Sequence, residues 1–303
     1  MPDSKNILVT GAAAGFGALI SRTLVARGHT VFAAFRDTAG RNAERAAALR
    51  DHSRGKPGKL HVLELDVLDE ASAEAAVGKA LETAGGLDGV VNNAGIGPGL
   101  GAYAEAVGMD QFRRAFDVNV FGIHRLTRAA LPAFRAAERG LFVNISSIMG
   151  RVVLPYSAVY TATKFAVEGL TESYRYELSG LGIDVVLIEP GGFPTGFFGN
   201  AEPPSDPERL KGYGALASAP ESLYAGFRQA ILVAGNRPDP QAVADAVAEV
   251  VDAPAGKRPA RVVVDPLMGG AAPEAVNRAA HEVQAGLLRG MGQERLLATA
   301  IRD

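Results

Sequence analysis

The 303-residue chain contains no cysteine. This excludes disulfide bonds, thiolate metal sites and cysteine nucleophiles. Its five histidines are scattered without ligand spacing, so the sequence predicts no metal site. It also lacks the roughly 18–20 consecutive apolar residues of a membrane span, and no signal-peptide core precedes the first apolar segment. Together these absences predict a soluble, cytoplasmic protein.

Long runs of one charge are missing as well. Charged residues make up 21% of the chain, are mixed in sign and sum to a net charge of −2, which argues against a nucleic-acid-binding surface. Hydrophobic residues make up 48%, which is ample for a buried core. With no internal repeat and no clear linker, we expect residues 1–303 to form a single domain.

Short apolar segments alternate along the chain with longer segments of helical spacing. Continuously apolar strands are typical of a parallel sheet covered on both faces, and strand–helix alternation is typical of doubly wound folds. The prediction is an α/β fold of three layers with about seven parallel strands, whose C-terminal ends form a ligand-binding edge. The expected strands are Asn6–Thr10, Thr30–Phe35, Leu60–Leu65, Gly89–Asn92, Leu141–Ile145, Asp184–Ile188 and Arg261–Val264.

The main helical segments are predicted at 16–27, 71–83, 109–139 and 159–178. Pro132 should kink or end the third of these helices. Gly85 and Gly180 are expected to terminate the helices that precede them.

Two segments fall outside this alternation. Residues 196–240 are rich in proline, and their place beside the ligand-binding edge predicts a substrate lid. The lid's larger apolar residues suit an apolar substrate, although packing against the body explains them equally well; they are Phe197, Phe198, Tyr213, Leu216 and Leu223. Residues 273–303 are alanine-rich with helical spacing and predict a C-terminal helical extension.

The first strand runs into a glycine-rich turn. Gly11 permits a tight strand-to-helix turn, Gly15 lets the backbone approach a pyrophosphate, and Gly17 lets the helix pack closely on the strand. The N-terminus of that helix, at Ala14 to Phe16, would then offer free N–H groups to the phosphates. The spacing is G-x-x-x-G-x-G rather than the commoner G-x-G-x-x-G, and taken alone it also fits a plain turn.

The end of the second strand bears on which cofactor is preferred. Phe35 stands where a carboxylate would bind the ribose hydroxyls of NAD, and the Arg36 guanidinium suits a 2′-phosphate. NADP(H) is therefore the predicted cofactor, with NAD(H) as an alternative. Asp37 leaves the matter open, because it could pair with Arg36 or contact the ribose itself, and Arg36 could be an ordinary surface residue.

Two further turns follow the third and fourth strands. Asp66, beside Val67, could accept a hydrogen bond from an adenine amino group, or could simply cap a helix. Asn93, Ala94 and Gly95 could let the backbone approach the cofactor, although alone they describe an ordinary turn.

Tyr160 and Lys164 carry the predicted chemistry. Residues at i and i+4 share a helix face, so both side chains can point at one site. A nearby ammonium favours the phenolate and is expected to lower the tyrosine pKa from about 10. Tyr160 would then exchange a proton with the substrate oxygen, to which Ser147, after the fifth strand, would also hydrogen-bond. This pattern predicts hydride transfer between a nicotinamide cofactor and a small-molecule carbonyl or alcohol.

Over roughly residues 5–195 the chain resembles the short-chain dehydrogenase/reductase family, in its single-domain type. The resemblance rests on the turn Thr10–Gly17, on Asn92–Gly95, and on Ser147, Tyr160 and Lys164. It implies a Rossmann fold and direct hydride transfer without a metal. The layout is similar to members that act on steroids, retinoids and other apolar ketones or alcohols, which implies an apolar substrate.

The resemblance also implies roles for residues that spacing alone does not single out. Asn119 matches the asparagine that supports a proton-relay water, and Pro190, Gly191 and Thr195 match the segment that closes over the nicotinamide. Family members commonly pair through the helices carrying the asparagine and the tyrosine, so a homodimer or homotetramer is expected.

Two positions in the turn depart from the family pattern. Ala14 replaces a frequent serine or basic residue, so Arg36 alone supports NADP, and Phe16 replaces an aliphatic residue.

Two other functions stay open. The chain could be a catalytically silent redox sensor, against which the intact Ser-Tyr-Lys set argues. It could also be an epimerase or dehydratase, which usually has a fuller C-terminal domain.

Overall fold

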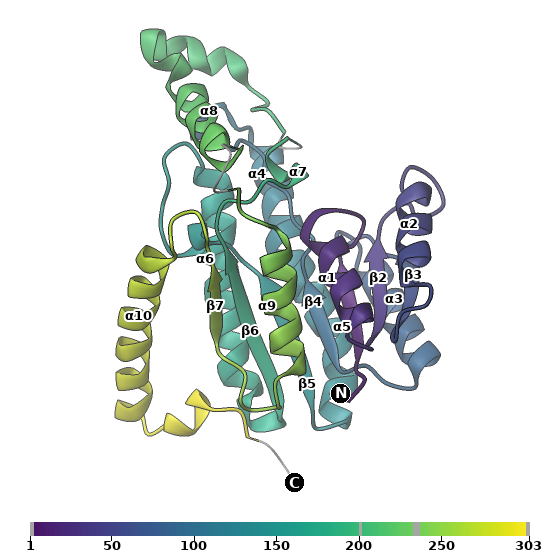
Figure 1. Cartoon of the computed structure of the whole chain (residues 1–303). Coiled ribbons are helices and arrows are strands. Elements are labelled where there is room, and N and C mark those ends of the chain that lie inside the picture. The colour runs from purple at the N-terminus through teal and green to yellow at the C-terminus, as the bar shows by residue number, and fades with distance from the viewer. Residues whose placement is uncertain (1–2, 200–201, 233–236, 301–303) are drawn as a thin grey trace.

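A seven-stranded, wholly parallel sheet forms the centre of the computed structural model, which describes residues 3–199, 202–232 and 237–300. The strand order is β3-β2-β1-β4-β5-β6-β7 (Figure 1). Strands β2 and β3 are added outward from β1 on one side, and β4 to β7 are added outward from β1 on the other side. All seven predicted strands are confirmed; they are β1 (Asn6–Thr10), β2 (Thr30–Phe35), β3 (Lys59–Glu64), β4 (Gly89–Asn92), β5 (Gly140–Ile145), β6 (Ile183–Pro190) and β7 (Arg261–Val264).

Helices cover both faces of this sheet, which confirms the predicted doubly wound fold (Figure 1). Packed on one face are α1 (Gly15–Ala26), α2 (Ala43–Ser53) and α9 (Gln241–Asp252). Packed on the other are α3 (Glu70–Ala84), α5 (Gly122–Ala136) and α6 (Ala158–Leu178).

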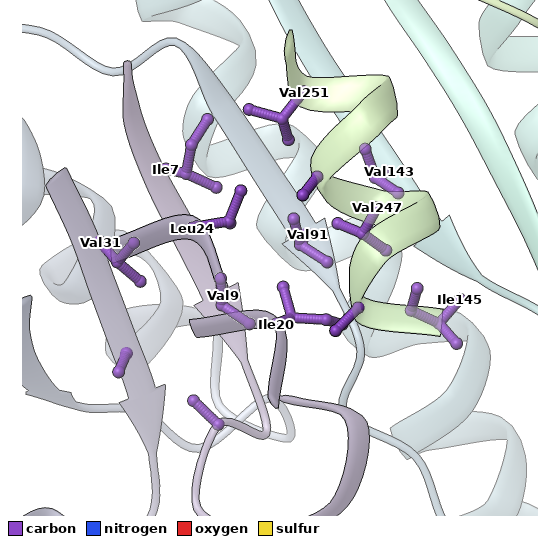
Figure 2. Close-up of a cluster of buried hydrophobic side chains, with 14 of the residues drawn as sticks. Ile7, Val9, Ile20, Leu24, Val31, Val91, Val143, Ile145, Val247 and Val251 are labelled. Atoms are coloured by element: carbon purple, nitrogen blue, oxygen red, sulfur yellow. The ribbon is translucent and has the colours of Figure 1, made fainter. Parts of the chain in front are cut away.

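Successive strand residues supply the two cores alternately, because side chains along a strand point to opposite faces. Ile7 and Val9 of β1 face α1 and α9, in the cluster drawn in Figure 2. Leu8, between them, faces the other layer. It is the second residue of a row that the register aligns across five strands: Phe32, Leu8, Val90, Phe142 and Val185. This two-sided burial explains why the strands read as continuous apolar segments.

The predicted helix over 109–139 is not a single helix. It begins as α4 (Met109–Phe116), passes through a π-helical segment at Asp117–Phe121, and continues as α5. The interruption therefore precedes Pro132, and α5 continues through that proline to Ala136. A π-helical insertion of this kind is frequent at functional sites.

Helix ends follow the glycine pattern in part. Gly85 ends α3 in the left-handed conformation, at φ 73°, as predicted. At the end of α6 the prediction of Gly180 is wrong by two residues. The helix passes into a 3-10 turn, Ser179–Leu181, and Gly182 takes the left-handed position at φ 72°.

The segment predicted as a lid rises beyond the C-terminal ends of the strands (Figure 1). It contains α7 (Gly196–Gly199), a 3-10 segment at Pro207–Ser218 and α8 (Ala219–Leu232). Residues 200–201 and 233–236 of the predicted lid lie outside the described part of the chain. The C-terminal extension forms α10 (Ala271–Gly290), beside β7, and a 3-10 turn at Glu294–Leu297.

Candidate active site

The turn between β1 and α1 requires its glycines for two different reasons. Gly11 and Gly15 have φ values of 65° and 54°, a region that side chains disfavour. Gly17 is required by packing, because a Cβ atom there would lie 2.5 Å from both the Gly11 carbonyl oxygen and the Asn93 Nδ2. The first turn of α1 carries no acidic residue, and Ala14 makes no side-chain cap. This arrangement leaves the helix N-terminus suited to a phosphate.

The turn after β4 is tied to the glycine turn. Thr10 Oγ1 accepts hydrogen bonds from the backbone N–H groups of Asn93 and Ala94, both at 3.0 Å. Asn93 Nδ2 in turn donates to the Thr10 carbonyl oxygen at 2.9 Å. The Asn93 side chain therefore holds two strand-end turns together. The small residues Ala94 and Gly95 leave the backbone open to the cavity beside them.

That cavity has a volume of about 870 Å³ and runs from the end of β2 to the lid. It brings together most of the predicted site residues. Three of the predicted residues do not line it: Gly17, Asp66 and Asn119. Those that do are Gly11, Ala14, Gly15, Phe16, Arg36, Val67, Asn93, Ala94, Gly95, Ser147, Tyr160, Lys164, Pro190, Gly191 and Thr195.

At the β2 end of the cavity, Arg36 is joined by Arg41 and Arg45, two arginines that the sequence analysis missed. Asp37 turns away from Arg36, with φ 56°, and its carboxylate lies 3.6 Å from Arg41 Nε. Asp66 instead lies 3.7 Å from Arg36 Nη1 and accepts from the Leu68 backbone N–H at 3.0 Å. Of the alternatives for Asp37, pairing with Arg36 is replaced by pairing with Arg41, while contacts of Asp37 with the ribose and of Asp66 with the adenine stay predictions.

Ser147, Tyr160 and Lys164 meet at the middle of the cavity. Tyr160 and Lys164 are buried on α6, with 8% and 6% of their surface exposed. Lys164 Nζ donates to the Ile145 carbonyl oxygen at 2.8 Å and lies 5.6 Å from the centre of the Tyr160 ring. Ser147 Oγ, just beyond the end of β5, accepts from the Met149 N–H at 3.1 Å.

The sequence predicted a lowered pKa for Tyr160, and for the protein without bound cofactor this prediction is wrong. Burial raises the pKa of this phenol, and the charge of Tyr224 adds to the rise, while a hydrogen bond from Ser147 opposes it. Burial also lowers the pKa of Lys164 to about 8, against the opposing effect of Glu168. Desolvation outweighs the hydrogen bond from Ser147, so Tyr160 is a protonated acid at neutral pH.

Asn119 lies in the π-helical segment and is almost fully buried, with 1% of its surface exposed. Its Oδ1 accepts from the Ile96 N–H at 2.8 Å, and its Nδ2 donates to the Ile96 carbonyl oxygen at 2.8 Å and to Thr163 Oγ1 at 3.0 Å. The side chain thus clamps the loop after β4 to α6. Support of a relay water by Asn119 stays a prediction.

The lid side of the cavity is apolar. Phe197, on α7, has its ring 5.3 Å from that of Tyr160, and Leu223, on α8, also lines the wall. Two other predicted lid residues do not reach the cavity. Tyr213 stacks on Tyr103 with 3.7 Å between ring centres, and Leu216 is exposed. The side chain of Phe198 lies outside the described part of the structure.

Other lining residues on this side were not anticipated, among them Tyr224 and Phe227 of α8.

Within the described residues, no group of three histidine or acidic side chains is placed to hold a metal ion. Nor does any helix in these ranges have the length and apolarity to cross a membrane.

Comparison with known proteins agrees with this geometry. A family model described as short chain dehydrogenase matches residues 5–205. A 3-ketodihydrosphingosine reductase from Bacteroides thetaiotaomicron is 36% identical over 194 residues, which cover 64% of this chain and 66% of that protein. Retinol dehydrogenase 16 from Mus musculus is 38% identical over 208 residues, which cover 68% and 62%. The chain thus spans just under two thirds of the length of these curated relatives.

Solved structures match over a larger share of the chain. A short-chain dehydrogenase from Streptomyces avermitilis has a TM-score of 0.71 at 30% identity, covering 97% of this chain and 98% of that one. The closed form of a serine dehydrogenase complexed with NADP⁺ has a TM-score of 0.68 at 30% identity, covering 85% and 93%. The similarity to solved structures therefore extends beyond the residues that the family model matches.

Proposed function

The chain belongs to the short-chain dehydrogenase family, and on that premise we propose that it is an oxidoreductase transferring hydride between NADP(H) and a carbonyl or alcohol. One observation carries the proposal. Ser147, Tyr160 and Lys164 line the same cavity as the glycine turn, so proton-transfer groups and a phosphate-binding turn share one cavity.

The residues present fit a dinucleotide. Gly11 and Gly15 adopt backbone conformations that leave room for a pyrophosphate, and the first turn of α1 offers its N–H groups there. When bound, the nicotinamide ring supplies or accepts the hydride. Asn93, Ala94 and Gly95 line the same cavity and would help to hold the dinucleotide.

The proton is handled by the chain's own side chains. Because burial keeps Tyr160 protonated, its hydroxyl donates a proton to the carbonyl oxygen in reduction and takes it back in oxidation. Ser147 Oγ hydrogen-bonds the same oxygen as negative charge develops on it. Lys164, whose pKa is about 8, is mostly cationic at neutral pH and stabilises the phenolate left on Tyr160. The apolar lid side limits access of water to these groups.

NADP(H) is the proposed cofactor because three guanidinium groups, from Arg36, Arg41 and Arg45, line the cavity beyond the end of β2. A 2′-phosphate is matched by such donors, whereas Phe35 offers no acceptor to the ribose hydroxyls of NAD. The similar serine dehydrogenase structure, which is complexed with NADP⁺, supports a nicotinamide dinucleotide, and the preference for NADP(H) rests on the three arginines.

The substrate is proposed to be apolar. The cavity wall opposite the glycine turn is formed by aliphatic and aromatic side chains, including Met149, Leu154, Phe197 and Leu223. The matching relatives are named for reductase activity on 3-ketodihydrosphingosine and dehydrogenase activity on retinol.

A homodimer or homotetramer is part of the proposal, supported by the exposed Phe165 on α6 and testable by light scattering.

Replacement of Tyr160 by phenylalanine tests this function. With a panel of apolar ketones, Tyr160→Phe should lower kcat for NADPH oxidation by about 10²–10⁴-fold, because the acid is lost. NADPH affinity should stay nearly unchanged. Tyr176→Phe is the matched control, because Tyr176 lies on the same helix and its hydroxyl binds Glu172 at 2.6 Å, outside the cavity.

Normal turnover by the Tyr160 variant would remove the role assigned to this residue. A wild-type protein that binds NADPH tightly but reduces no ketone, and oxidises no matched alcohol with NADP⁺, would instead favour a catalytically silent redox sensor.

A further inference from the structure

Tyr224 of α8 is a buried phenol that the proposed reaction does not use. It lines the same cavity as Tyr160, and only 6% of its surface is exposed. Within the described residues, its hydroxyl oxygen has no hydrogen-bond partner. Buried polar groups in native proteins are nearly always paired, so an unpaired one in a cavity wall indicates a partner that enters the cavity.

The nearby Ser157 hydroxyl does not fill this role. Ser157 Oγ donates its one proton to the Leu154 carbonyl oxygen at 2.6 Å, and it lies 3.1 Å from Thr161 Oγ1. Ser157 lies near enough to oppose the rise that burial causes in the Tyr224 pKa, but its single proton is already used, and among the described residues the Tyr224 hydroxyl makes no hydrogen bond in which it donates to Ser157 Oγ either.

Packing fixes the direction in which Tyr224 points. Gly101 has φ 76°, and a Cβ atom there would lie 3.0 Å from Tyr224 Cγ, so the ring rests directly on the Gly101 backbone. That backbone is itself held by a hydrogen bond from the Gly101 N–H to the Tyr156 carbonyl oxygen at 2.9 Å. The Phe227 ring lies on another side, with 6.4 Å between ring centres. The hydroxyl is therefore aimed by the fold rather than free to swing.

Tyr224 and Tyr160 act on one region of the cavity. The charge of Tyr224 is close enough to raise the pKa of Tyr160. The side chains of Leu100, Leu154 and Phe197 pack against the cluster that contains Tyr160, so the cavity wall beside the proton-transfer groups is largely apolar. A substrate whose carbonyl oxygen meets Tyr160 thus brings its neighbouring atoms to a wall with an unpaired hydroxyl.

Resting on the function proposed above, we propose that Tyr224 is a specificity-determining residue that hydrogen-bonds a second polar group of the substrate. This group, a hydroxyl or an amine, stands close to the reacting carbonyl, since Tyr160 and Tyr224 line the same cavity. The preferred substrate class is therefore an apolar chain with a polar substituent close to its ketone.

The consequence is discrimination against plain ketones. A plain ketone displaces water from the cavity and leaves the Tyr224 hydroxyl buried without a partner, whereas a hydroxy ketone replaces the lost bond. One hydrogen bond of this kind corresponds to about a tenfold preference in kcat/KM, and a more complete match gives a larger one.

The test uses three probes of equal chain length: an alkyl methyl ketone, its α-hydroxy counterpart and its β-hydroxy counterpart. Initial rates of NADPH oxidation give kcat/KM for the wild type and for Tyr224→Phe, which removes only the hydroxyl. The wild type should prefer one of the hydroxy ketones over the plain ketone by about tenfold or more in kcat/KM, and the variant should lose that preference.

Tyr213→Phe is the matched control. Tyr213 lies in the same lid, its hydroxyl donates to Glu105 Oε2 at 3.1 Å, and it does not line the cavity, so its loss should leave the preference intact. An unchanged preference in Tyr224→Phe, or no preference in the wild type, would overturn the assignment.

Calorimetric titration of the same probes into the NADP⁺-loaded protein separates this proposal from the proposed function. If no probe is reduced but the wild type binds a hydroxy ketone about tenfold more tightly than Tyr224→Phe does, the oxidoreductase proposal fails and the role of Tyr224 as a ligand-binding residue stands. If binding is equal in the two proteins, the role of Tyr224 fails whatever the rates show.

Discussion

Lys164 should make the stability of this protein depend on pH in the alkaline range. Its ammonium group is buried, and burial lowers its pKa from the ordinary value of 10.5 to about 8. The difference of about 2.5 corresponds to about 3.4 kcal/mol, at 1.36 kcal/mol for each tenfold change in proton affinity. This is the cost of keeping a cation at that position when the protein is folded.

The sign follows from where each state binds its proton. Between about pH 8 and pH 10.5 the unfolded chain keeps the lysine proton and the folded chain releases it, so stability rises with pH in that window. Below about pH 8 both states are protonated and the full cost is present. Tyr160, whose pKa is raised, stays neutral in the folded state throughout this window.

Urea denaturation of the wild type and of Lys164→Met, at about pH 7.5 and about pH 9.5, measures the effect. The free energy of unfolding of the wild type, relative to that of the variant, should increase by about 2 kcal/mol between the two pH values. The substitution also removes the hydrogen bond to Ile145 and alters the local packing. These effects are the same at both pH values, so they cancel when the two differences in unfolding free energy are compared. A difference that stays constant with pH would refute the argument that burial governs Lys164.

Three further changes test other parts of the site. Gly17→Ala places a methyl group 2.5 Å from the Gly11 carbonyl oxygen, a backbone atom, and should cost about 1–3 kcal/mol in urea denaturation. Asn119→Ala leaves the Ile96 N–H and carbonyl oxygen without their side-chain partner, and should lower the free energy of unfolding by about 2–4 kcal/mol. Arg36→Ala should weaken NADPH at least tenfold more than NADH in fluorescence titrations, because a charged contact with the 2′-phosphate is lost.

Each of these three predictions has a result that would contradict it. A Gly17 variant as stable as the wild type would mean that α1 shifts without cost. Asn119→Ala with unchanged stability would show that the loop after β4 does not need its clamp. Equal losses of NADPH and NADH affinity on replacement of Arg36 would remove the argument for NADP(H).

The sequence alone was sufficient for the sheet, and most of the site residues that it predicts line one cavity, although their roles stay predictions. Strands buried on both faces read as continuous apolar segments, so all seven were located within about two residues. Tyr160 and Lys164 were identified because helical geometry makes spacing along the chain equivalent to direction in space. These are local relations, and local relations are visible in a sequence.

The tertiary structure decided what depends on burial and on contacts between distant segments. The pKa of Tyr160 moves up rather than down because desolvation is its largest cause, and desolvation is set by everything packed around the site. Asp37 pairs with Arg41, and Arg36 lies instead beside Asp66, a residue from a different strand end.

Tyr224 shows the same limit most clearly. In the sequence it is one aromatic residue within a proline-rich segment. Its burial, its contact with the backbone of Gly101 and its unpaired hydroxyl all arise from packing across more than a hundred intervening residues. Periodicity and spacing carry no information about such contacts, because the free energy that fixes them exists only when the chain is folded.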